Sequence, residues 1–149
     1  MPSKTIVDVI KYTEMLSPSE MIKWALRNVR EVLDVLNISY AAIPEYREMV
    51  FYCNLFLIGK LRVEQMRQKS LLINEKALLE KDEAKANLLR AFGYTLTTSD
   101  IKQHALQASE YALKALLSAN VSAETVQKMA NKQKADLETL ACFIVAVDK

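Results

Sequence analysis

Residues 17–36, SPSEMIKWALRNVREVLDVL, begin with the clearest helix-start signal in the chain. Ser17 is placed to cap a helix, Pro18 takes the first helical position, where its missing N–H costs nothing, and Glu20 can reach back to the Ser17 amide. Apolar residues then recur at three- and four-residue steps, as one face of an α-helix requires. They are Ile22, Ala25, Leu26, Val29, Val32, Leu33 and Leu36. We therefore predict a helix that ends near Asn37.

The same signals predict a single all-α domain over residues 1–149, built as a bundle of five to six helices. Besides the helix above, we expect helices from about Lys4 to Leu16, from Pro44 to Phe92, from Thr98 to Ala119 and from Ser122 to near the C-terminus. Gly93 is a good stop after the long central helix or helix pair, because glycine tolerates the left-handed backbone that often follows a helix. Asn120 and Ser122 leave room for only a short loop, so the last two helices should form an antiparallel hairpin.

The segment over residues 44–92 leaves two interpretations open. It is either one rod of nearly fifty residues or, as we favour, two helices that break near residues 70–75. Its first part, residues 49–58, is apolar on all sides, which predicts a buried position at the centre of the bundle. Residues 60–85 are heavily charged and have a poor apolar stripe. We therefore expect that stretch to form an arm that protrudes or bridges to a partner.

Alanines repeat at three- and four-residue steps along the helix expected from Thr98. They are Ala105, Ala108, Ala112, Ala115 and Ala119. Small side chains allow two helix axes to approach closely. We therefore expect this face to pack on another helix.

The composition fits a globular helical protein. Of the 149 residues, 51% are hydrophobic and 26% charged, with only 2 glycines and 3 prolines, which excludes wholesale disorder and disfavours a many-stranded sandwich. The net charge of +2 gives no general reason to expect a polyanion partner. The sequence shows no signal-peptide pattern and no apolar run of about 20 residues, so we expect a cytoplasmic protein. Cys53 and Cys142 have apolar neighbours, and both are expected to be reduced and buried.

The sequence carries no recognised catalytic or cofactor motif. Two glycines cannot build a phosphate-binding loop, and there is no CxxC, HExxH or Cys/His cluster that would hold zinc. The single histidine, His104, lies beside an apolar stripe, where a structural or surface role is usual. We therefore expect no enzyme, no cofactor and no metal. A catalytic protein that uses His104 is a weaker hypothesis than either an assembly protein or a nucleic-acid-binding protein.

Two sets of basic residues are candidates for contact with nucleic acid. They are Lys23, Arg27 and Arg30 in one set and Lys60 and Arg67 in the other. The first set shares one side of its predicted helix, away from the apolar stripe, and such residues can neutralise phosphates. However, Asp34 follows Arg30 at i+4, which favours an ordinary surface ion pair.

Residues 104–121, HALQASEYALKALLSANV, resemble the central helix of the HEPN family of small helical proteins, several of which are ribonucleases. The active ribonucleases of that family carry an arginine, followed several residues later by a histidine, after this helix. No arginine or histidine follows Val121 in this chain. The resemblance therefore implies no catalytic activity, and we do not assign the family from it.

These observations favour a non-enzymatic helical interaction protein. We expect it to work by assembly, either as a homo-oligomer or as a small subunit of a larger particle, with a protein partner or a second copy as its ligand. The alternative is a nucleic-acid-binding helical protein, such as a nucleocapsid subunit or the small subunit of a ribonucleoprotein complex. Neither a membrane nor a small-molecule substrate is indicated.

Overall fold

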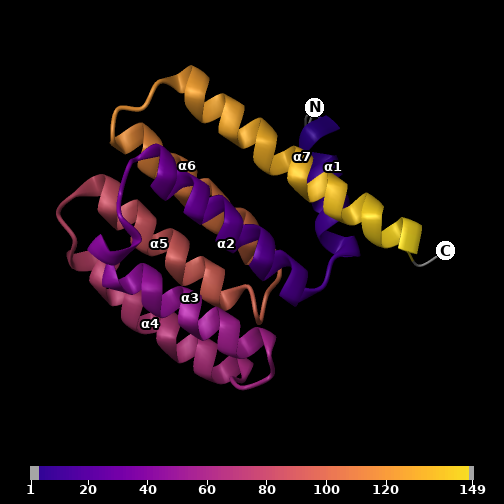
Figure 1. Ribbon diagram of the computed structural model, residues 1–149, viewed down its shortest axis with the longest axis horizontal. Coiled ribbons are helices and arrows are strands. Elements are labelled where there is room, and N and C mark those ends of the chain that lie inside the picture. Colours follow the sequence, from indigo (N-terminus) through magenta and orange to yellow (C-terminus); the bar gives the residue numbers. More distant parts are fainter. Residues whose placement is uncertain (1–3, 148–149) are drawn as a thin grey trace.

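The computed structural model describes residues 4–147, and the side chains of residues 8–143. Every regular element in that range is helical (Figure 1). The elements are α1 (Lys4–Met15), α2 (Pro18–Val35), the 3₁₀ turn η1 (Tyr40–Ala42), α3 (Pro44–Leu57), α4 (Val63–Leu79), α5 (Glu83–Thr97), α6 (His104–Ser118) and α7 (Ala123–Val147). The all-α prediction is confirmed, although the described part of the chain holds seven α-helices where five to six were expected.

The predicted caps form as the sequence indicates. Glu20 donates its amide to Ser17 Oγ at 3.2 Å, and Ser17 donates its own amide to Glu20 Oε1 at 2.9 Å, which completes a capping box at the start of α2. Ser122 Oγ likewise accepts from a backbone amide in the first turn of α7. Asn37 and Asn120 adopt the left-handed backbone conformation, with φ of 56° and 64°, and end α2 and α6.

Both interpretations of residues 44–92 are wrong, because this segment forms three helices. Gly59, with φ +77°, ends α3. The Lys60 amide donates to the Leu55 carbonyl at 2.8 Å and the Gly59 amide to the Phe56 carbonyl at 3.0 Å, which is a Schellman ending. The second break follows α4, where Asp82 caps α5 by accepting from the Lys85 amide at 3.1 Å. Residues 70–75 lie in the middle of α4.

Gly93 does not end a helix but lies buried inside α5, which continues to Thr97. Its carbonyl accepts a hydrogen bond from Ser70 Oγ of α4 at 3.0 Å. A Cβ atom at this position would lie 2.3 Å from Oδ1 of Asn74, so the Asn74 side chain occupies the space that the glycine leaves. The glycine therefore serves the packing of α4 against α5 rather than termination. The next helix begins at His104, later than predicted.

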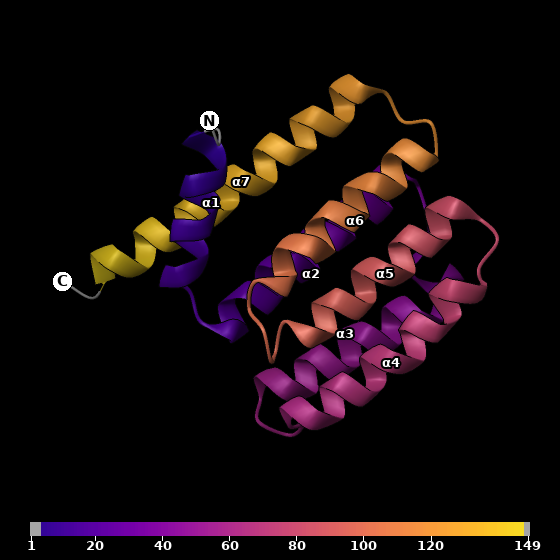
Figure 2. The ribbon, with the colours of Figure 1, turned by 180° about the vertical axis from the view of Figure 1, so that it is seen from behind.

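The centre of the bundle is α5, not residues 49–58. Figures 1 and 2 show α5 between α3 and α4 on one side and α2 and α6 on the other. Its buried apolar residues are Ala86, Leu88, Leu89, Ala91, Phe92 and Leu96. In residues 49–58, by contrast, only Met49 and Cys53 are fully buried, and Phe51 and Ile58 are exposed. A protruding arm is also wrong, because α4 lies along α5, whereas the bridge to a partner stays a prediction.

The alanine stripe meets neighbouring helices as predicted. Ala105, Ala108, Ala112 and Ala115 are buried, whereas Ala119, at the end of α6, is exposed. This helix packs against α5 and α2. A short loop joins α6 to α7, and the two run antiparallel side by side with α1 across α7 (Figures 1 and 2). The predicted C-terminal hairpin is therefore confirmed.

The two cysteines differ, contrary to prediction. Cys53 is buried in α3, and burial raises the pKa of its thiol to about 12. Cys142 is exposed on α7, because the core side of that helix is taken by residues such as Leu137 and Ala141. Within residues 4–147, none of the helices is both apolar and long enough to cross a bilayer.

Candidate functional site

Four leucines on the outer side of α4 form the most unusual surface of the described structure. Leu71, Leu72, Leu78 and Leu79 are each more than half exposed, and Leu78 and Leu79 reach 80% and 82%. We call these four residues the leucine face. Single exposed apolar residues are ordinary, but a contiguous cluster of large ones marks an interaction site.

The spacing along α4 explains why these leucines cannot enter the core. The helix turns Met66, Ser70, Ile73 and Ala77 toward the bundle, at steps of three and four residues. The leucines occur as two adjacent pairs seven residues apart, which places both pairs on the opposite side of the helix. The helix is therefore apolar on two sides, and the bundle covers only one of them.

A groove of about 400 Å³ separates the leucine face from α3. Leu72 and Leu79 line it together with Tyr52 and Glu48. A neighbouring hollow of about 390 Å³ shares Tyr52 and Glu48 and adds the exposed Phe51. The apolar surface therefore continues from α4 onto α3.

Charged residues beside this groove are partly paired. The Lys76 ammonium lies 3.7 Å from a Glu45 carboxylate oxygen, and the Lys69 ammonium lies 5.0 Å from the centroid of the Tyr52 ring. Glu48 and Glu75 also line the groove, and neither has an ion-pair partner within 4.0 Å among the described residues. Lys69 in this groove and Arg47 in the neighbouring hollow likewise have no carboxylate within 4.0 Å among the described residues, so the unpaired charges beside the leucines are of both signs.

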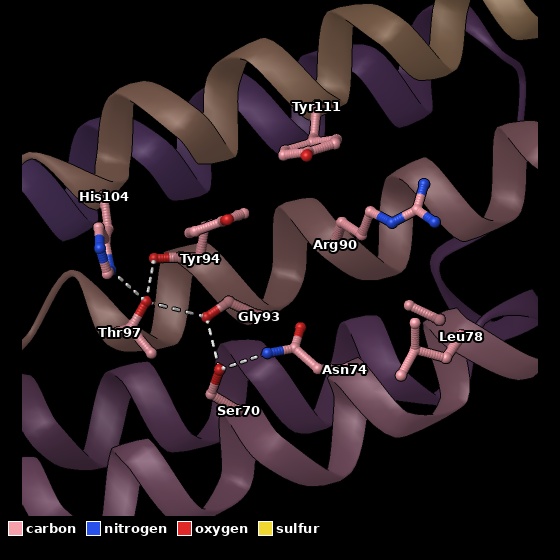
Figure 3. A pocket seen from close by; sticks show the side chains of 10 residues that line it. Ser70, Asn74, Leu78, Arg90, Gly93, Tyr94, Thr97, His104 and Tyr111 are labelled. Atoms are coloured by element: carbon pink, nitrogen blue, oxygen red, sulfur yellow. Dashed lines mark hydrogen bonds between the residues drawn. The ribbon is translucent and has the colours of Figure 1, made fainter.

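A second groove, of about 360 Å³, lies over α5 on the other side of α4 (Figure 3). We call it the α5 groove. Its wall on α4 includes Ser70, Asn74 and Leu78, its floor on α5 includes Arg90, Gly93, Tyr94 and Thr97, and its wall on α6 carries His104 and Tyr111. Leu78 belongs both to this groove and to the leucine face, so the two surfaces are continuous.

His104 is held at one end of the α5 groove. Its Nδ1 lies 2.8 Å from Thr97 Oγ1, and its ring meets the Tyr94 ring edge-on with centroids 5.3 Å apart. Burial lowers the pKa of His104, and the negative charge of Asp100 partly opposes that shift. A neutral, hydrogen-bonded and half-buried histidine fits the structural role that the sequence favours.

Arg90 occupies the other end of the groove. Its Nη1 donates to Asn87 Oδ1 at 3.1 Å, and its guanidinium carbon lies 5.9 Å from the centroid of the Tyr111 ring. Tyr111 stacks on Tyr94 with ring centroids 5.5 Å apart and an interplanar angle of 10°. Figure 3 shows the guanidinium extending away from His104, toward the Leu78 side.

The residues predicted to contact nucleic acid are divided between distant elements. Lys23, Arg27 and Arg30 are exposed on α2, whereas Lys60 follows α3 and Arg67 is on α4. Arg27 lies 3.5 Å from Glu31, and Arg67 lies 3.0 Å from Asp100. The structure therefore brings the first three together but does not join them to the other two.

The predicted pair of Arg30 with Asp34 does not form. Asp34 instead accepts a hydrogen bond from the Tyr40 hydroxyl at 2.6 Å, because η1 carries Tyr40 back over the end of α2. In the part of the chain that the structure describes, no three His, Cys, Asp or Glu side chains come together to hold a metal ion.

The leucine face was missed at the level of sequence, although a signal for it exists. The stripe from Met66 to Ala77 is the core side of α4. The two leucine pairs lie outside this stripe, so they are apolar residues that the core cannot bury. The core stripe could not be recognised because two of its members, Ser70 and Ala77, are small or polar. The α5 groove joins residues from three helices and has no continuous sequence signal.

A comparison with protein families gives a match that spans most of the chain. A family model described as "Imm-5 like putative immunity protein" matches residues 11–140. The chain belongs to this family. The leucine face and the α5 groove of this Imm-5 like chain both lie inside the matched range. No curated protein and no solved structure matches it.

Proposed function

We propose that this chain is an immunity protein that acts without catalysis, by binding and thereby blocking a harmful protein. The family supports the immunity role, and the leucine face is the observation that carries the binding mechanism. Large apolar side chains held on a rigid helix are suited to form the buried centre of a protein interface. The partner is therefore expected to cover α4 and the adjoining part of α3.

The position of Glu75 favours a different protein over a second copy. Glu75 lies midway between Leu71 and Leu79 in the sequence of α4. A two-fold pairing of this face with itself brings Glu75 against its own copy, and like charges in contact oppose association. A partner whose apolar patch carries lysine or arginine would instead compensate Glu75 and Glu48.

No specific observation favours the nucleic-acid alternative as a second candidate. The five basic residues are divided between two distant sites, and two of them already form ion pairs.

The immunity role is tested by survival of the source organism. A strain that lacks the gene should be outcompeted by its parent, and the wild-type gene should restore it. The double variant Leu72→Asp, Leu79→Asp should fail to restore survival, because it places charge in the centre of the interface. Leu117→Asp is the matched control, since Leu117 is an exposed leucine on α6 away from this face. Full protection by the double variant would contradict the proposal.

Binding is tested with a photocrosslinking amino acid at Leu79, followed by purification of the crosslinked protein. The purified partner should bind the wild type and the Leu117→Asp control and lose affinity for the double variant. The non-catalytic mechanism has its own test, because His104→Ala should protect cells as well as the wild type. Loss of protection by a folded His104→Ala variant that still binds the partner would indicate catalysis instead.

A further inference from the structure

The α5 groove holds one cation that has no opposite charge near it. Arg90 is half-buried, and its only hydrogen bond among the described residues goes to the neutral Asn87 amide. Within the described range, no carboxylate lies within 4.0 Å of its guanidinium. Among the described residues that line the groove, none is an aspartate or a glutamate. Four of the five guanidinium N–H groups thus have no acceptor among the described residues.

Two tyrosine hydroxyls also line the groove. Neither the Tyr94 nor the Tyr111 hydroxyl makes a hydrogen bond to the part of the protein that the structure describes. The Asn74 side chain directs its Nδ2 toward Ser70 Oγ, at 3.4 Å, and away from Arg90 (Figure 3). The groove therefore offers a positive charge together with hydroxyl groups that can donate, which is a pattern that recognises an oxyanion.

Other charges near the groove keep this end positive. Asp100, which acts on His104 at the far end, is paired with Arg67 at 3.0 Å. The Lys114 ammonium lies 4.6 Å from the Tyr111 ring centroid, although Glu110 at 3.3 Å compensates it. An anion that enters this end of the groove therefore meets the Arg90 guanidinium, and no described carboxylate of this chain competes with it for that contact.

We propose that the Arg90 end of the α5 groove binds a carboxylate, and that this carboxylate is an aspartate or glutamate side chain of the protein partner. The inference rests on the proposed function, because a protein seated on the leucine face passes over Leu78, which also borders the groove. The volume of about 360 Å³ admits a side chain but not a helix, which is about 10 Å across. Arginine binds a carboxylate through two parallel hydrogen bonds, so the contact fixes orientation as well as affinity.

The chemistry of the groove is tested on the protein alone by titration with sodium acetate. Sodium chloride at the same ionic strength is the reference, and NMR signals of the Arg90 side chain and the Tyr111 ring are followed. We expect saturable shifts of the Tyr111 ring signals with acetate in the wild type and in the control Arg47→Gln, an exposed arginine on α3, and no such shifts in Arg90→Gln. Equal responses to acetate and chloride, or an unchanged response in Arg90→Gln, would overturn the site.

The source of the carboxylate is tested with the crosslinked and purified partner. Arg90→Gln should weaken binding by at least about tenfold, because it leaves a desolvated carboxylate unpaired. Tyr111→Phe keeps the ring stack but removes one donor and should weaken binding only a few-fold. Arg90→Lys keeps the charge without the fork and should fall between the wild type and Arg90→Gln. Thermal unfolding of each variant checks that the fold is intact.

The outcomes separate this inference from the proposed function. If Arg90→Gln binds the partner like the wild type while Leu72→Asp, Leu79→Asp does not, the carboxylate contact is overturned and the leucine face stands. If inorganic phosphate saturates the groove at lower concentration than acetate and leaves partner binding unchanged, the groove is a site for a free anion and the assignment to a partner side chain is overturned. If no partner binds the leucine face, the proposed function itself fails.

Discussion

Helices α4 and α5 are neighbours in sequence, similar in length and packed against each other, yet their burial is opposite. α5 is enclosed by four helices and buries most of its residues. α4 buries one narrow stripe and turns four leucines outward. The number of apolar residues does not explain this difference, because both helices are rich in leucine.

The distribution of small residues explains it better. α5 contains Ala86, Ala91 and Gly93, all of them buried, at points where neighbouring helices approach. Small side chains shorten the distance between helix axes, so several neighbours can surround one helix. α4 alternates leucines with charged side chains on its outer side, which no second layer covers. A helix can therefore be apolar either to support the fold or to remain available for a partner.

The difference in burial between α4 and α5 predicts that Phe92→Ala, at the centre of α5, causes the largest loss of unfolding free energy. Phe92 is fully buried and lies against Tyr46, with ring centroids 5.8 Å apart. Truncation of a buried phenylalanine costs about 3–5 kcal/mol of unfolding free energy. Urea denaturation measures the loss, with Leu72→Ala on α4 as the control. A loss below about 1 kcal/mol would mean that α5 is not the packing centre.

A smaller effect is expected for Asp82→Ala, which removes the cap that separates the two helices. The Lys85 amide then loses its acceptor, and such caps contribute about 1 kcal/mol. Lys81→Ala, one residue earlier and exposed, should be neutral in the same denaturation experiment. Equal stability of the two variants would show that the break between α4 and α5 does not depend on this cap.

Gly93→Ala tests the contact between α4 and α5, because its effect on the unfolding free energy should depend on whether Asn74 is present. With Asn74 present, the new Cβ displaces the amide that lies 2.3 Å from it. With Asn74→Ala, that obstacle is gone and alanine gains about 1 kcal/mol of helix propensity over glycine. A double-mutant cycle should therefore give a coupling of at least about 0.5 kcal/mol. Identical effects of Gly93→Ala in both backgrounds would contradict the packing described here.

The smallest effect on stability belongs to the leucine face. Leu78→Ala and Leu79→Ala should each change the unfolding free energy by less than about 0.5 kcal/mol, because neither side chain is buried on folding. The same variants should weaken partner binding under the proposed function. If they instead destabilise the isolated protein as much as Asp82→Ala does, the leucines support the fold and are not held for a partner.

The sequence by itself determined those features that depend on residues close together in the chain. The capping box at Ser17, the cap at Ser122 and the stops at Asn37 and Asn120 are local hydrogen-bond and backbone effects, and all four are present. The alanine stripe of α6 was also readable, because its spacing is that of one helix face. These signals suffice for the all-α class and for the C-terminal hairpin.

Only the tertiary structure decided which helix is central, which glycine ends a helix and which apolar residues stay outside. Gly93 was predicted to end a helix but lies inside one, whereas Gly59, within the segment 44–92 predicted as helical, ends α3. A glycine's role depends on whether another helix lies against it. Leu79 and Leu89 are equally apolar, and their burial differs because α5 has neighbours on several sides and α4 does not. Arg90 meets Tyr111 only through the packing of α5 on α6, and no spacing within the sequence encodes that contact.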